Sequence, residues 1–156
     1  MSRRAKEYRK RQSPDSVHGS LVLSKFINKV MMSGKKSIAR DIVYRALEIL
    51  SQKVNAPAVD AFEKALRNAI PLMEVRSRRV GGSTYQVPME VRAERGVSLA
   101  MRWLINNSRT RSGHSMIEKM SAELIDAYNG VGASIKKREE THRMAESNKA
   151  FAHFRW

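Results

Sequence analysis

Three arginines spaced seven residues apart form the most specific chemical pattern in this sequence. Arg95, Arg102 and Arg109 recur nearly every two turns of a helix, and Ser98 and Asn106 fall between them on the same face. At the helical rise, successive guanidinium groups would lie about 10 Å apart on a stripe without acidic residues. A row of donors with this charge suits the phosphates of a nucleic acid. A solvated polar face that binds nothing is the alternative interpretation.

A second basic cluster lies in a stretch that alternates between apolar and polar residues. Arg76, Arg78 and Arg79 come just before a two-glycine tip, and the alternation on both sides predicts a β-hairpin at about residues 73–91. Such a basic ribbon can enter a groove of RNA, and the glycines let its backbone approach a phosphate or a base closely. The same charges could instead only protect an exposed strand edge from pairing.

Lysines extend the basic pattern toward the N-terminus. Lys25 and Lys29 are four residues apart on one expected helix, and Lys35 and Lys36 lie where that helix breaks and the next begins. The break lacks the first glycine and the preceding strand of a nucleotide-binding loop, so we expect phosphate contact at a helix N-terminus instead. Residues 1–17 are predicted to be a flexible basic arm that binds RNA through Arg3, Arg4, Lys6, Arg9, Lys10 and Arg11.

Catalysis and metal binding receive no support from the sequence. The four histidines are scattered, there is no cysteine, and the adjacent Glu139 and Glu140 would point about 100° apart on a helix. We therefore expect no enzyme activity, no metal and no cofactor. A basic DNA-binding protein is an alternative, but it would require a recognition helix and commonly a dimer seam. No expected helix has a second apolar face for such a seam, so we do not expect a homo-oligomer.

Composition and charge agree with a folded polyanion-binding protein. The chain has 156 residues, 30 Lys and Arg against 15 Asp and Glu, a formal net charge of +15, and 42% hydrophobic residues. This length and apolar content suffice for one domain with a core. No apolar run reaches the ~18–20 residues of a membrane span, so no membrane partner is expected.

Helical periodicity predicts the elements that must position these cations. The expected fold is mainly α, a single helical domain of about six helices with one protruding β-hairpin and basic terminal extensions. The body would span residues 18–149 and an aromatic, basic tail residues 150–156. Leu21 and Ile38 are expected on inner helix faces, and Asn55 is expected to cap the third helix. The helices are expected at about 20–32, from 37 on, at 57–70, 92–109, 115–128 and 133–149.

Five stretches of the sequence form a recognisable set. They are Gly19-Ser20, Ser33-Gly34-Lys35-Lys36, the hairpin sequence from Val75 to Pro88, Leu99-Ala100-Met101-Arg102-Trp103-Leu104, and the stretch from Lys136 to Glu146. Together they resemble the bacterial branch of the family of small-subunit ribosomal protein seven. The similarity covers roughly residues 19 to 156 and is closest in the hairpin and the last helix.

The resemblance implies a non-enzymatic structural constituent of the bacterial small ribosomal subunit, located in the cytoplasm on the ribosome. It implies a primary binder of small-subunit (16S-type) rRNA that nucleates head assembly. From the basic charge of residues 97–115 we also expect Arg111 to contact this RNA. Gly81, Gly82 and Tyr85 of the hairpin would lie near the exit-site tRNA. Repression of its own messenger RNA is an alternative role. Neighbouring small-subunit proteins nine and eleven would meet the last helix and tail, at Arg143, Phe151, Phe154, Arg155 and Trp156.

Overall fold

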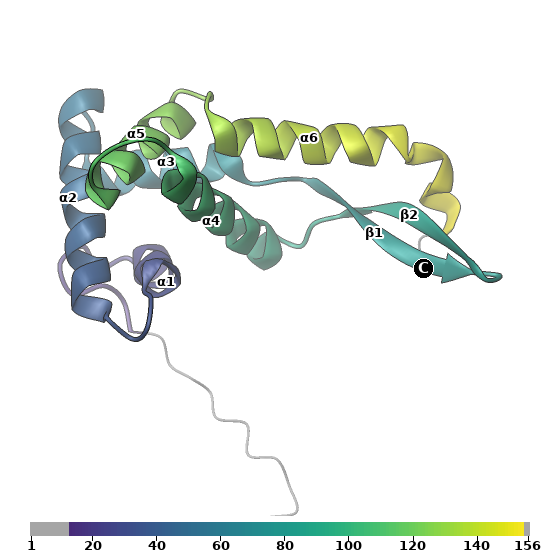
Figure 1. Cartoon of the computed structure of the whole chain (residues 1–156), viewed down its shortest axis with the longest axis horizontal. Helices are drawn as coiled ribbons and strands as arrows, with labels where there is room; N and C mark the ends of the chain where they lie inside the picture. Colours follow the sequence, from purple (N-terminus) through teal and green to yellow (C-terminus); the bar gives the residue numbers. More distant parts are fainter. Residues whose placement is uncertain (1–12, 155–156) are drawn as a thin grey trace, which may run out of the picture.

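The computed structural model describes residues 13–154 and shows a helical body from which a two-stranded hairpin projects (Figure 1). The predicted arm cations at positions 3–11, together with Arg155 and Trp156, lie outside the described residues. The mainly helical prediction with one hairpin is confirmed. The elements are α1 (Leu21–Val30), α2 (Lys36–Val54), α3 (Ala58–Ala69), β1 (Met73–Val80), β2 (Ser83–Glu90), α4 (Ala93–Thr110), α5 (Met116–Tyr128), α6 (Ala133–Ser147) and a short 3₁₀ helix, η1 (Lys149–Phe154).

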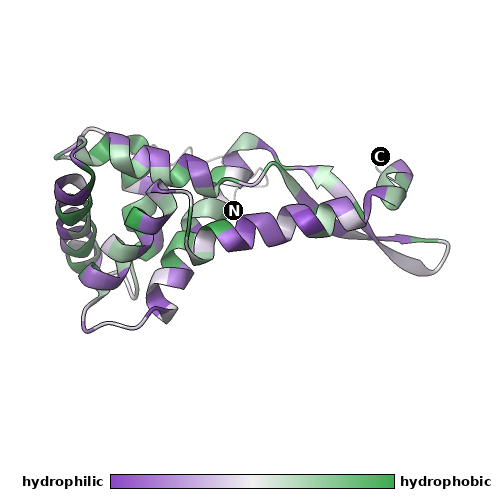
Figure 2. Cartoon of the chain, turned by 90° about the horizontal axis from the view of Figure 1, so that it is seen from above, coloured by the Kyte–Doolittle hydropathy of each residue, from purple (hydrophilic) through white to green (hydrophobic). Residues whose placement is uncertain are grey.

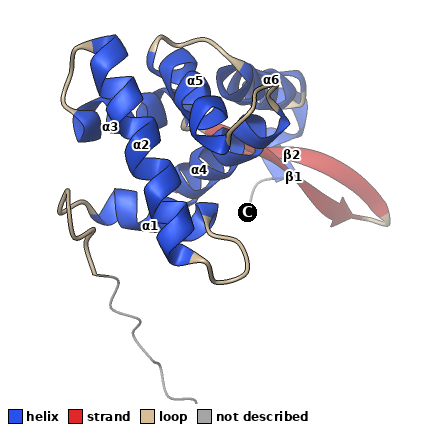
Figure 3. Ribbon diagram, turned by 60° about the vertical axis from the view of Figure 1, so that its left-hand side comes forward, coloured by secondary structure: helices blue, strands red, loops and turns tan. Residues whose placement is uncertain are grey.

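The core lies where the first five helices meet, on the side of the molecule opposite the hairpin tip (Figure 3). Helix α5 packs against α2, α3 and α4. The rings of Phe26 and Phe62 are fully buried, with centroids 5.0 Å apart, and so join α1 to α3. This shared core fixes the orientation of the helices, and their outer faces are exposed to solvent.

Serine side chains cap the starts of α1 and α5. The Oγ of Ser20 accepts a hydrogen bond from the Leu23 N–H at 3.3 Å, and the Oγ of Ser115 accepts one from the Glu118 N–H at 3.2 Å. The expected role of Asn55 was wrong. It ends α2 in the left-handed conformation, with φ of 52°, which asparagine tolerates better than most residues, and α3 starts without a side-chain cap.

Two apolar side chains expected inside are outside. Leu21 is 49% exposed and Ile38 is 55% exposed. In α1 the buried face is set by Leu23, which lies about 200° around the helix from Leu21. In α2 the buried face consists of Ala39, Val43, Ala46, Leu47 and Leu50. Ile38 lies to one side of this face. Neither helix therefore needs these two residues for its core.

The end of the predicted arm is held to the body at Asp15. Asp15 is buried, accepts a hydrogen bond from the Tyr44 hydroxyl at 2.7 Å, and accepts another from the His18 N–H at 3.1 Å. Burial raises the pKa of Asp15, but these hydrogen bonds outweigh it and the net pKa is lowered. The expected flexible arm, residues 1–17, therefore includes a residue, Asp15, that is part of the folded body.

The hairpin is antiparallel, with Arg76 opposite Val87 and Val80 opposite Ser83. Its two-residue turn has φ of 57° and 91° at the two glycines, which is why the tip needs glycine. Val87 and Pro88 are buried, and α6 lies along the ribbon (Figure 1). The ribbon is therefore supported by a helix of the same chain.

The last helix and the tail close onto the hairpin. Hydrophilic residues cover most of α6 (Figure 2), but Ser134, Ile135 and Ala145 are buried beneath it. After α6 the chain turns into η1, where the rings of Phe151 and Phe154 lie 5.3 and 4.9 Å from the ring of Tyr85. The tail was expected to meet a partner with these two residues, and in the structure both contact the hairpin of the same chain.

Lowering the pH should weaken the contact between α6 and the segment before β1. His142 Nε2 accepts a hydrogen bond from the Leu72 N–H at 2.9 Å, which a protonated ring cannot do. Burial and then the charge of Arg138 lower the pKa of His142. Above about pH 6.5 the ring is neutral in both folded and unfolded chains, so it contributes no pH dependence. Below that pH the unfolded chain takes up the proton first, so the free energy of unfolding falls.

Urea unfolding of the parent and of His142→Gln, at about pH 7.5 and 5, checks this prediction. We expect the stability of the parent relative to the variant to decrease at the lower pH. Because other titrating groups are common to both proteins, they cancel in this difference. A difference that is independent of pH would contradict the prediction.

None of the helices within residues 13–154 has the length and apolar character of a membrane span.

Candidate nucleic-acid interface

Helices α1 and α4 lie side by side and bring two of the predicted basic clusters together. Lys29 Nζ donates a hydrogen bond to Ser98 Oγ at 3.0 Å, and Arg109 Nη2 donates one to the Val30 carbonyl at 3.3 Å. Two hollows between the helices share Lys29 in their walls. We call the two together the α1–α4 groove and define it by its polar and charged residues, Lys25, Asn28, Lys29, Glu94, Ser98, Arg102, Asn106 and Arg109.

The groove continues to the start of α2. Arg109 and Lys35 line a further, largely apolar hollow together with Met32. Lys36 is exposed as the first residue of α2, where no side chain caps the free N–H groups. The partial positive charge of that helix end adds to the lysines and favours an anion. The structure thus unites the lysines of α1, the break before α2 and two arginines of α4.

The third arginine of the predicted row has a different environment. Arg95 Nε donates to both carboxylate oxygens of Glu74, at 2.8 and 2.9 Å, and Arg76 Nε donates to the same group at 2.6 Å. Glu74 comes from the hairpin, so the spacing of arginines along α4 could not reveal it. The row therefore consists of two arginines in the groove and one arginine at the base of the hairpin.

Arg111 is not part of the groove. Its side chain is 29% exposed and forms ion pairs with Glu123 and Asp126 of α5. Burial opposes the charged form of Arg111, but the hydrogen bonds to Asp126 and Glu123 raise its pKa above the ordinary value. The residue fastens α4 to α5, and the structure gives no support for its predicted contact with RNA.

The remaining predicted residues lie farther along the molecule. Arg78 lies opposite Tyr85 in the hairpin register, and Arg79 and the two tip glycines are exposed. Arg143 is exposed on α6. The structure therefore does not bring these residues to the α1–α4 groove but spreads them over the hairpin and the helix beside it.

Two residues of the site were missed from the sequence. Asn28 lines the groove beside Lys25, from which it is three residues away. That spacing was a usable signal for a shared helix face. Glu74 gave no such signal, because its partner Arg95 is 21 residues away on another element.

In the part of the chain that the structure describes, no three acidic, histidine or cysteine side chains converge as a metal site would require. The groove instead offers amines, guanidiniums, a hydroxyl and amides. These are donors for phosphate and for the polar edges of RNA. These groups suit a polyanion.

Comparison with known proteins identifies the family of the chain. The family model for ribosomal protein S7p/S5e matches residues 2–149. Similar proteins include the small ribosomal subunit protein uS7 of Chlamydia caviae, 60% identical over 157 aligned positions, and that of Thermomicrobium roseum, 56% identical over 156. Both alignments cover all of this chain and all of the relative. With a basic groove on a helical body, a projecting hairpin and this identity over its full length, the chain belongs to the ribosomal protein S7p/S5e family.

Proposed function

We propose that this small-subunit ribosomal protein binds 16S-type rRNA through the α1–α4 groove. The observation that carries the proposal is the convergence of Lys25 and Lys29 with Arg102 and Arg109 across two helices held by direct hydrogen bonds. Among the described residues that line the groove and the hollow beyond it, Glu94 is the single acid. Cations held this close repel one another unless an anion neutralises them, and an RNA backbone supplies such anions.

The rest of the molecule fits a role in which one folded domain recognises RNA shape. A rigid helical body can read the geometry of an RNA junction through phosphates and 2′-hydroxyl groups rather than through a base sequence. Binding of this kind would order the RNA of the subunit head before other proteins arrive. We therefore propose that the chain is a primary binder that nucleates head assembly.

The hairpin and the tail are proposed to make the remaining contacts on the ribosome. The ribbon projects away from the body with exposed Gly81 and Gly82 at its tip, a shape suited to reach the exit-site tRNA (Figure 1). Arg143 and the end of the chain remain as the surface for small-subunit proteins nine and eleven. Because Phe151 and Phe154 are packed on Tyr85, this surface would include the hairpin as well as the tail.

The double variant Arg102→Ala/Arg109→Ala tests the groove. We expect its affinity for a transcript of the 3′ major domain of 16S rRNA to fall by about ten- to a hundredfold, because charge-assisted contacts to phosphate are lost. The slope of log K against log salt should become shallower by about 1 for each lost contact. Filter binding at four salt concentrations measures both quantities.

Arg45→Ala/Arg67→Ala is the matched control, because it removes the same charge from exposed sites on α2 and α3 that do not line the groove. It should bind nearly as well as the parent. Equal affinities for the parent and the groove variant, with helicity intact by circular dichroism, would place the RNA elsewhere. Tighter binding of the parent to duplex DNA than to the transcript would favour a DNA-binding role.

A further inference from the structure

Glu74 is a buried carboxylate at the base of the hairpin, where the ribbon meets α4. The residue is 7% exposed, although it lies on a strand whose neighbours Arg76 and Ser77 are exposed. Its oxygen Oε1 accepts hydrogen bonds from Arg76 Nε at 2.6 Å and from Arg95 Nε at 2.8 Å. One carboxylate therefore holds an arginine of the hairpin and an arginine of α4.

This arrangement leaves the outer ends of both guanidinium groups available. The two Nε atoms share one oxygen, so they lie no more than about 5.4 Å apart, the sum of their distances to it. The side chains of Arg76 and Arg95 are 50% and 48% exposed. Each guanidinium is held to Glu74 through its Nε atom, so these hydrogen bonds leave the Nη donors for another partner. Two cations around one anion leave a net positive charge at the surface.

We propose that Glu74 is a positioning residue that presents Arg76 and Arg95 jointly to one backbone phosphate of the RNA. The proposal rests on the proposed function and adds a phosphate site to it. Each guanidinium is fixed through Nε and directs its remaining donors outward, where the two groups can grip one phosphate from two sides. Because the side chains are ordered before binding, less conformational entropy is lost when the phosphate arrives.

The location of the pair supports this role. Arg95 lies one turn before Ser98 and two turns before Arg102 on α4, so the pair extends the α1–α4 groove toward the hairpin. A phosphate bound there would lie at the hinge between ribbon and body. RNA bound in the groove would then also set the direction in which the hairpin points.

A purely electrostatic view of Glu74 makes the opposite prediction from this proposal. If the carboxylate only neutralised two arginines, its removal would raise the positive charge facing the RNA and tighten binding. If it positions them, its removal lets both side chains move independently and weakens binding, although the protein becomes more positive. The sign of the change therefore separates the two accounts.

Glu74→Gln and Glu94→Gln form a matched pair for this test. Both remove one negative charge, and Glu94 lines the groove but holds neither arginine. We expect Glu74→Gln to bind the 3′ major domain transcript three- to tenfold more weakly than the parent, and Glu94→Gln to bind more tightly, because it removes the acid that faces the RNA in the groove. Equal or tighter binding by Glu74→Gln overturns the proposal.

A double-mutant cycle gives a second test that does not depend on Glu74 variants folding. If Arg76 and Arg95 grip one phosphate, each single alanine variant loses most of the contact. The fold-loss of the double variant should then be clearly smaller than the product of the single losses. The proposal is overturned if the fold-loss of the double variant equals the product of the two single losses within experimental error. Failure of the proposed function is distinguishable, because in that case Arg102→Ala/Arg109→Ala would bind like the parent.

Discussion

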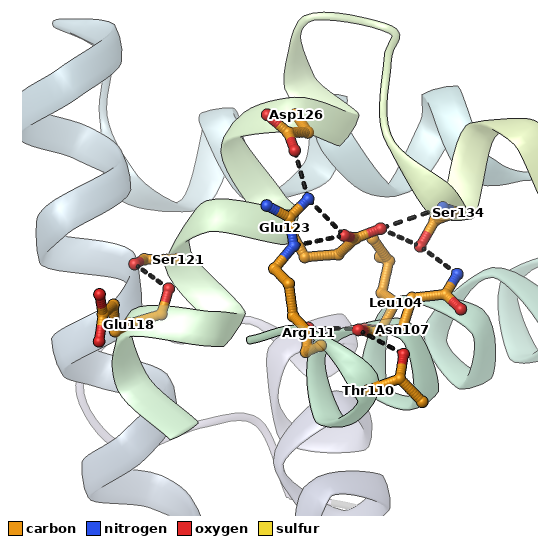
Figure 4. A network of polar contacts seen from close by, with 10 residues as sticks. Leu104, Asn107, Thr110, Arg111, Glu118, Ser121, Glu123, Asp126 and Ser134 are labelled. Carbon is orange, nitrogen blue, oxygen red and sulfur yellow. Dashed lines mark hydrogen bonds and ion pairs between the residues drawn. The ribbon is translucent and has the colours of Figure 1, made fainter. Parts of the chain in front are cut away.

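Replacing Glu123 by alanine is expected to lower the free energy of unfolding by about 3–5 kcal/mol, the usual cost of breaking a buried ion pair by removing one partner. Glu123 is 1% exposed, and both of its carboxylate oxygens are fully used (Figure 4). Oε2 accepts from Arg111 Nε and Nη2 at 3.0 and 2.8 Å. Oε1 accepts from the Ser134 N–H at 3.0 Å and from its hydroxyl at 2.6 Å.

The large expected effect follows from what the variant leaves behind. Without Glu123, two buried donors of Ser134 lose their acceptor, and Arg111 keeps only the more exposed Asp126. Asn107 donates to the Ser134 hydroxyl at 3.1 Å, so the loss also reaches α4. Each buried donor left unsatisfied accounts for about 1–3 kcal/mol of this loss. Three helices, α4, α5 and α6, would loosen together.

Urea unfolding followed by circular dichroism measures this change, and Asp126→Ala is the control. Asp126 binds the same arginine, but its side chain is 35% exposed and Glu123 would still hold Arg111. We expect the control to cost under about 1.5 kcal/mol, as for a solvent-screened pair. Equal losses in the two variants would mean that burial does not decide the importance of these carboxylates.

The helices of the body were predictable because their signals are local. The stretch predicted at 115–128 became α5, Met116–Tyr128, because Ser115 supplies a cap and apolar residues recur at helical spacing. Lys25 and Lys29 were expected to share a stripe, and both line the groove. Periodicity places residues on a helix face, so it also predicts which cations lie next to one another on that helix.

The partners of the arginines were not predictable in this way. Arg95 binds a carboxylate 21 residues away, and Arg111 binds one 12 residues away. Both pairs depend on how separate elements pack, which no pattern along one helix contains. Arg111 has the same residue type as Arg109 and lies two positions from it, yet only Arg109 lines the groove. Charge alone therefore overestimates the number of arginines that are free to bind RNA.

The contact between the tail and the hairpin was missed for a related reason. Aromatic residues at a chain end are compatible with docking on another protein and equally with docking on the same chain. Tyr85, the residue that decides between these possibilities here, is 66 positions before Phe151 and lies on a strand that was assigned to tRNA contact. The docking character of the tail was recognised, but its first partner is the hairpin.

Replacing Phe62 by alanine is expected to cost about 3–5 kcal/mol of unfolding free energy, the range for a large aromatic removed from a core. Its ring is fully buried and lies against the ring of Phe26 on α1. The deletion would leave a cavity between α1 and α3 that neighbouring helices cannot fill, since α3 is also packed against α5. Because α1 forms one wall of the α1–α4 groove, we expect the variant to lose RNA affinity as well as stability.

Ile38→Ala is the control that shows whether burial, rather than apolar character alone, causes the loss of stability in Phe62→Ala. Both positions fall on apolar periodic patterns in the sequence, but Ile38 is 55% exposed, so its truncation should cost under about 1 kcal/mol. Thermal and urea unfolding of the two variants under the same conditions provide the comparison. A loss at Ile38 as large as that at Phe62 would mean that the exposed face of α2 is covered in the free protein. A small loss at Phe62 would mean that α1 is not held to α3 by the two phenylalanine rings, and that the groove's geometry depends instead on the hydrogen bonds from Lys29 and Arg109.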